Sequence, residues 1–169
     1  GCGAGQARRR AAARTLHLEF CLINRNHARM ACPFRHTHRV TYAECTDGNH
    51  VYHSRYLDLL EAARGECLRA LGSTVLHWQR HDAIFPVIEA RLIYKAPARY
   101  DDLLTIEVWP TAVEKVRLNF GHRIFNQDGK LVLKAETFHA CTNLDDRPRR
   151  LPPALAEILS PHVLPDNLR

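Results

Sequence analysis

A dense group of polar side chains stands near residue 50, between two segments with regular apolar patterns. Its members are Glu44, Thr46, Asp47, Gly48, Asn49, His50, Tyr52 and His53. A carboxylate in such a group can serve as a general base or as a nucleophile, and a neighbouring His can orient a polar substrate. Asp-Gly-Asn is also a common tight-turn sequence. The residue types alone therefore leave a catalytic loop and an ordinary turn as alternatives.

The polar group leads directly into a predicted helix over Ser54–Leu71. The apolar face expected from the spacing comprises Leu57, Leu60, Arg64, Cys67, Leu68 and Leu71. Ser54 is a suitable N-cap, and Gly72 follows where a C-terminal glycine is common. The first turn of a helix presents unpaired N–H groups and the positive end of the helix dipole. The loop before this helix could therefore bind an anion or a polarised carbonyl.

The remaining patterned segments predict strands. Phe34–Tyr42 alternates between apolar and polar residues, which is typical of a half-buried strand. After the helix we expect four more strands, with a hairpin turn at Gln127-Asp128-Gly129 and a short helix opened by Pro152 and Pro153. These strands are Val87–Lys95, Leu103–Trp109 (ended by Pro110), Lys115–Asn126 and Leu131–Thr142. The order predicts an α+β domain in which one long helix covers a five-stranded antiparallel sheet.

Self-association is expected from the length of the predicted strands. If the sheet stops at Lys115–Asn126, that strand presents a long, flat edge. Proteins rarely leave such an edge exposed, and pairing with a two-fold mate would cover it. We therefore expect a dimer at least, and a tetramer is also consistent with the sequence.

The formal charge of +6 is concentrated at the N-terminus. Residues 1–30 contain six Arg and one Glu, whereas the rest contains 18 Lys or Arg and 17 Asp or Glu. We therefore divide the chain into a basic segment over residues 1–29 and a domain over residues 30–169. The segment could be a targeting sequence, a disordered basic arm, or upstream sequence read in frame before Met30. The nearly neutral domain makes nucleic-acid binding unexpected, although the Arg-rich segment keeps a nucleic-acid or membrane-surface accessory role as an alternative.

Several other classes of protein are disfavoured. No apolar run approaches the roughly 20 residues that a membrane-spanning helix requires. The six Cys include no C-x-x-C spacing, which is typical of a reduced, cytoplasmic protein. His36 and His38 would share a strand face, but no third ligand stands at a recognisable spacing, so no metal site is expected. The motifs of serine hydrolases, nucleotide-binding loops and zincins do not occur.

Two segments resemble the hotdog-fold acyl-CoA thioesterases. RVTYAECTDGNHVYHSRYLDLLEAARGE (Arg39–Glu66) is similar to the signature of the 4-hydroxybenzoyl-CoA thioesterase family and its Tol–Pal-associated relatives. YKAPARYDDLLTIEV (Tyr94–Val108) is similar to a second family segment, and the resemblance extends over about Phe34–Leu159. It implies a hotdog fold, metal-independent hydrolysis of an acyl-CoA or acyl-carrier-protein thioester, and no cofactor.

The resemblance also implies roles for individual residues. Asp47 matches the family carboxylate that attacks the thioester or activates water, while backbone amides near His53–Arg55 would polarise the carbonyl. Tyr52 and His53 would orient the thioester. An ungapped pairing instead places Thr46 at the family Asp position, which leaves Glu61 or Glu44 as the alternative carboxylate. The expected cations for the CoA phosphates are Lys95, Arg99, Arg117 and Arg147. If the loop has lost its carboxylate, the protein would be a non-catalytic acyl-CoA binder.

Overall fold

The computed structural model describes residues 32–165. The predicted segment over residues 1–29 lies outside this range. Five strands form one antiparallel sheet in the order β1-β3-β4-β5-β2. Their bounds are β1 Phe34–Arg39, β2 Val87–Tyr94, β3 Leu103–Val113, β4 Arg117–Phe125 and β5 Leu131–Ala140. The helices are α2 Arg55–Ala70, α3 Val75–Arg80 and α4 Pro153–Leu159, with short 3-10 turns at Tyr42–Glu44 and Ser160–His162.

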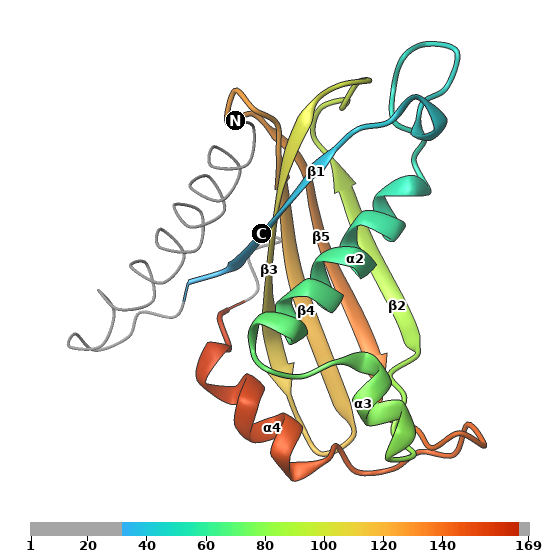
Figure 1. Ribbon diagram of the computed structural model, residues 1–169, viewed down its shortest axis with the longest axis vertical. Helices are drawn as coiled ribbons and strands as arrows, with labels where there is room; N and C mark the ends of the chain where they lie inside the picture. Colours follow the sequence, from blue (N-terminus) through green and yellow to red (C-terminus); the bar gives the residue numbers. More distant parts are fainter. Residues whose placement is uncertain (1–31, 166–169) are drawn as a thin grey trace, which may run out of the picture. The chain divides into compact units, whose positions relative to one another are not determined.

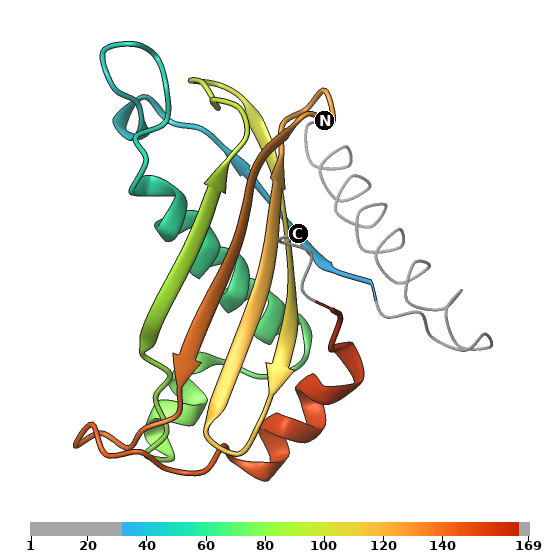
Figure 2. The same cartoon turned by 180° about the vertical axis from the view of Figure 1, so that it is seen from behind.

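Helix α2 lies across one face of the sheet (Figure 1), and buried side chains from both form the core. Seen from behind, the strands lie in front of the helix (Figure 2). Leu60 of the helix and Leu104, Ile106 and Ile124 of the sheet are completely buried. This arrangement confirms the predicted α+β class, with one long helix covering a five-stranded antiparallel sheet. No helix in residues 32–165 is long and apolar enough to cross a membrane.

The buried face of α2 differs from the predicted face. Its buried residues are Tyr56, Leu59, Leu60, Ala63, Cys67 and Leu68. Leu57, which was expected in the core, is 42% exposed. The apolar residues extend more than halfway around the helix, so their spacing could not fix the rotation of the helix on the sheet. Ser54 precedes α2 as predicted but makes no side-chain capping bond, whereas Gly72 follows the helix at φ +79°.

Two predicted strand ends were wrong. Pro110 does not end β3, because the strand continues to Val113 through an irregularity between Pro110 and Ala112. A proline lacks the N–H that a regular ladder needs, and a bulge removes that requirement. The first strand ends at Arg39 rather than Tyr42, because Tyr42–Glu44 turns into a 3-10 helix. Helix α3 was not predicted.

The sheet edges also differ from the prediction. Strand β4, which corresponds to the segment expected at an edge, lies between β3 and β5. The edges are β1 and β2. Most residues of β2 are exposed on both of its faces, including Val87, Ile88, Ile93 and Tyr94. Strand β2 is therefore the apolar edge that could accept a partner.

Candidate active site

The polar group forms a tight turn between β1 and α2. Cys45 and Val51 make an antiparallel bridge, and the Thr46 N–H donates to the His50 carbonyl at 2.8 Å. The Asn49 N–H donates to the Thr46 carbonyl at 2.9 Å, which closes the turn. Asp47 is exposed in this turn and makes no hydrogen bond or ion pair with any other residue in 32–165. Its carboxylate is therefore accessible to water or to a substrate.

The residues just before α2 are held by neighbouring segments. The Tyr94 hydroxyl donates to the His53 carbonyl at 2.9 Å, and the rings of Tyr52 and His53 lie 4.3 Å apart. The Arg55 N–H donates to the Tyr52 carbonyl. Within the described part of the chain, the N–H groups of His53 and Ser54 donate to no acceptor. These two amides, at the positive end of the α2 dipole, can hold a developing oxyanion.

An open depression adjoins this helix end. It lies between the polar turn, the start of α2 and the segment that follows β2. Its lining residues are His50, Val51, His53, Tyr56, Tyr94, Lys95, Ala96 and Pro97. Tyr56 and Tyr94 pack edge to face with ring centroids 5.5 Å apart, and burial raises the pKa of both phenols. The depression combines an aromatic wall with one Lys and two His.

The predicted site residues do not all meet at this depression. His53 and Lys95 line it, while Arg99 lies four residues past Lys95, where its N–H donates to Asp102 at 2.8 Å. Arg117 begins β4 beside Ala140, and Arg147 follows β5, so both lie at the opposite end of the sheet. Within a single protomer, Arg117 and Arg147 are not brought to the same end as the depression.

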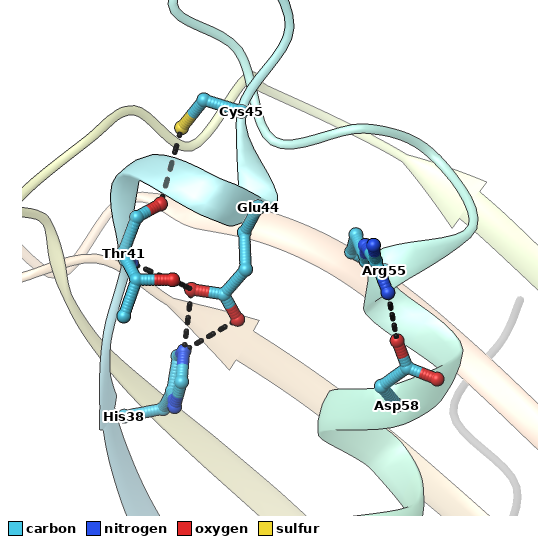
Figure 3. A network of polar contacts seen from close by, with 6 residues as sticks. All are labelled: His38, Thr41, Glu44, Cys45, Arg55 and Asp58. Carbon is cyan, nitrogen blue, oxygen red and sulfur yellow. Dashed lines mark hydrogen bonds and ion pairs between the residues drawn. The ribbon is translucent and has the colours of Figure 1, made fainter.

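The two alternative carboxylates have different surroundings. Glu61 is exposed on α2, eight residues past His53 and about 12 Å along the helix. Glu44 accepts hydrogen bonds from the Nε2 of His38 at 2.8 Å and from the Thr41 hydroxyl at 2.7 Å, and the Thr41 N–H also donates to it (Figure 3). Burial acts to raise the pKa of Glu44, but these hydrogen bonds outweigh it and lower the pKa. Glu44 thus anchors the turn at Thr41 to β1.

Sequence reasoning missed Tyr56, Tyr94 and the partner of Glu44. Tyr94 begins the second segment that carries the family resemblance, so its position was a usable signal. Tyr56 stands among the apolar residues of α2, so the sequence offered no reason to assign it to the site. His38 was considered only as a metal ligand, because alternation along a strand identifies a shared face and not the partner across it.

Comparison with known proteins supplies the family. Residues 48–133 match the thioesterase superfamily, 4HBT. The acyl-CoA thioester hydrolase YbgC of Escherichia coli O6:H1 is 34% identical over 123 residues, which cover 72% of this chain and 92% of that protein. The acyl-CoA thioesterase YbgC of Haemophilus influenzae is 33% identical over 63% of this chain and 78% of that protein.

Solved structures agree with this match. The DHNA-CoA thioesterase of Staphylococcus aureus is 25% identical and superposes with a TM-score of 0.72, covering 75% of this chain and 88% of that chain. The hypothetical protein TT1821 of Thermus thermophilus is 29% identical with a TM-score of 0.71, covering 75% of this chain and 96% of that chain. The predicted resemblance is confirmed: the chain belongs to the thioesterase superfamily and is a hotdog-fold thioester hydrolase.

Proposed function

We propose that the depression at the start of α2 is the active site, and that it hydrolyses an acyl-CoA to a free acid and a thiol. The observation that carries this proposal is the pair of unengaged amides at His53 and Ser54, beside an open, aromatic-walled depression. Donors placed where charge develops are typically worth about 2.7–4 kcal/mol each in acyl transfer. The names of the relatives support CoA over a carrier protein as the thiol component.

Asp47 is the proposed carboxylate. It shares the tight Thr46–His50 turn with His50, and His50 lines the depression. Its exposure and lack of partners leave it ready to activate water or to attack the thioester carbonyl. Glu44 is already held by His38 and Thr41. Glu61 is the second candidate, because its distance along α2 favours a role at the site of another protomer.

We infer that two protomers pair along β2. Edge strands present unpaired N–H and C=O groups, and β2 adds exposed apolar side chains such as Ile88 and Ile93. A two-fold axis would align the two β2 strands antiparallel. The Tyr94 end of one protomer would then lie opposite the Val87 end of its partner. Arg117 and Arg147, which lie at the far end of the sheet, would reach a depression only in this way.

Thiol release from a series of acyl-CoA esters tests the activity and the carboxylate. Asp47→Asn should lower kcat by about 10²-fold or more, as expected when a general base or nucleophile is lost. Glu66→Gln is the matched control, since Glu66 lies on α2 and pairs with Arg69 at 2.6 Å. If Asp47→Asn keeps full turnover and Glu61→Gln abolishes it, Glu61 is the catalytic carboxylate. Binding of acyl-CoA without thiol release would identify a non-catalytic binder.

Sedimentation tests the pairing along β2. The chain should sediment with at least twice the mass of one chain, and Ile93→Glu should shift it toward the monomer. Leu144→Glu is the control, because Leu144 is 56% exposed in the loop after β5. A wild-type monomer at micromolar concentration would contradict the inference.

A further inference from the structure

A chain of polar groups runs from α2 into the sheet, away from the depression. Arg64 reaches from α2 to β5, where its Nη1 donates to the Thr137 hydroxyl at 3.4 Å. Nε2 of His139 lies 3.1 Å from the same hydroxyl, and Nδ1 of His139 lies 3.0 Å from the Phe85 carbonyl. Because a carbonyl only accepts, Nδ1 carries the proton, and because burial lowers the pKa of His139, Nε2 is unprotonated and accepts from the Thr137 hydroxyl. His139 is therefore a neutral imidazole with both nitrogens engaged.

Two members of this region have unmet hydrogen-bonding capacity. His122 of β4 is 1% exposed, and neither of its ring nitrogens has a hydrogen-bond partner among residues 32–165. Arg64 is largely buried, and no carboxylate of the described residues lies within 4 Å of its guanidinium. Its one hydrogen bond is long, and a guanidinium has five N–H donors. Burial lowers the pKa of Arg64 to about 10, and Glu61, one turn earlier on α2, partly offsets this.

These unmet groups call for an acceptor that carries negative charge. Native proteins pair nearly all of their buried polar groups, so each exception requires an explanation. Among residues 32–165, the titratable groups that interact with Arg64 are the two imidazoles and Glu61. Both imidazoles are neutral because burial lowers their pKa values. A carboxylate fits a guanidinium in a bidentate manner, which a hydroxyl group cannot do.

The register of β2 sets the distance between this region and a thioester site. His139 pairs with Val87 and Thr137 pairs with Ala90, whereas Tyr94 lies about 13 Å further along the strand. In the antiparallel pairing inferred above, the Tyr94 end of one protomer lies opposite the Val87 end of its partner. The partner's Ala90 then lies opposite Arg91, three residues from Tyr94, so the partner's Thr137 is roughly 10 Å along the strands and 10 Å across them, or about 14 Å from Tyr94. A short acyl group and the long Arg64 side chain can bridge that span together.

We propose that Arg64, backed by Thr137, His139 and His122, forms the subsite for a carboxylate at the far end of the acyl group. The substrate class is then a short dicarboxylic acyl-CoA, held between the thioester site of one protomer and Arg64 of its partner. This proposal rests on the proposed function and on the pairing along β2. Arg64 then determines substrate specificity and does not contact the reacting thioester.

The test compares two esters with the same number of carbons, glutaryl-CoA and pentanoyl-CoA. We expect kcat/KM for the glutaryl ester to be about tenfold higher or more in the wild type, since a hydrogen-bonded charge pair contributes that factor. Arg64→Met keeps most of the side-chain length and should abolish this preference through KM, while pentanoyl-CoA turnover persists. Arg69→Met is the control, because Arg69 is exposed on the same helix and pairs with Glu66. Arg64→Lys should restore part of the preference.

Several outcomes would overturn the proposal. Equal kcat/KM values for the two esters in the wild type would do so, and so would a higher kcat/KM for 4-hydroxybenzoyl-CoA than for either ester. An unchanged ratio of the glutaryl to the pentanoyl kcat/KM in Arg64→Met would also overturn it. Should Arg64→Met not fold, Thr137→Val replaces it and should lower the ratio. If no ester is hydrolysed, the proposed function fails. Calorimetric titration with the two esters then still tests whether Arg64 binds the distal carboxylate, and tighter binding of glutaryl-CoA would support it.

Discussion

Acid should destabilise this protein through the buried histidines beneath α2. Burial lowers the pKa of His139 from 6.5 to about 4, Arg64 adds to this, and the Phe85 carbonyl opposes it. The pKa of His122 is also lowered, well below its usual value, by burial first and then by Arg64 and His139, against the nearby backbone groups. A base with a depressed pKa stays neutral in the folded state, while the unfolded chain takes up a proton below pH 6.5.

The magnitude for His139 follows from the two pKa values. Stability should be unaffected by this group above about pH 6.5 and should fall by about 1.4 kcal/mol per pH unit between 6.5 and 4. The total loss from His139 is about 3 kcal/mol. His122 acts in the same direction. Since small domains are stable by only about 5–15 kcal/mol, the loss is a large fraction of the total.

Urea unfolding between pH 7.5 and 4.5, at one fixed protein concentration, measures this effect. His139→Gln removes the titrating group, so its stability should be lower at pH 7.5 but should decline less steeply on acidification. His50→Gln is the control, because His50 is exposed in the turn before α2. If the wild type and His139→Gln lose stability in parallel from pH 7 to 4.5, His139 is not held neutral and the reasoning is wrong.

Four further substitutions test the packing and the site. Gly121→Ala should lower the thermal midpoint, at a cost on the order of 1–3 kcal/mol, because its Cβ would lie 2.6 Å from the buried Trp109 ring. Gly65→Ala, whose Cβ has room on α2, should raise the thermal midpoint by stabilising the fold by up to about 1 kcal/mol, and an equal change in midpoint for the two variants would contradict this. Glu44→Gln should cost about 1 kcal/mol at pH 7, measured by urea unfolding, and a neutral result would show that the turn holds without it. Tyr94→Phe should raise KM several-fold in the thiol-release assay, because it removes the hydrogen bond that holds the His53 carbonyl just before α2. An unchanged KM would show that this hydrogen bond does not position the site.

Much of the candidate site could be read from the sequence. The polar turn, the start of α2 and the Tyr94–Val108 segment were identified by residue type and family resemblance, and two of the predicted residues, His53 and Lys95, line one depression. The assignment of Asp47 stays a prediction. The separation of Arg117 and Arg147 from that depression could not be foreseen, because a count of basic residues carries no information about which end of a sheet each one occupies.

The sequence by itself determined the elements that depend on local chemistry. Apolar patterns and turn residues identified the five strands, the 3.6-residue period identified α2, and Gly72 and Gly129 take up the positive φ values that their turns require. Only the tertiary structure decided what depends on pairing between distant segments. It placed β4 inside the sheet and β2 at its edge, and it brought His122 close enough to Arg64 for their charges to interact. The physical reason is that periodicity indicates which residues of an element share a face, whereas the neighbours of that face are selected by long-range packing of the whole chain.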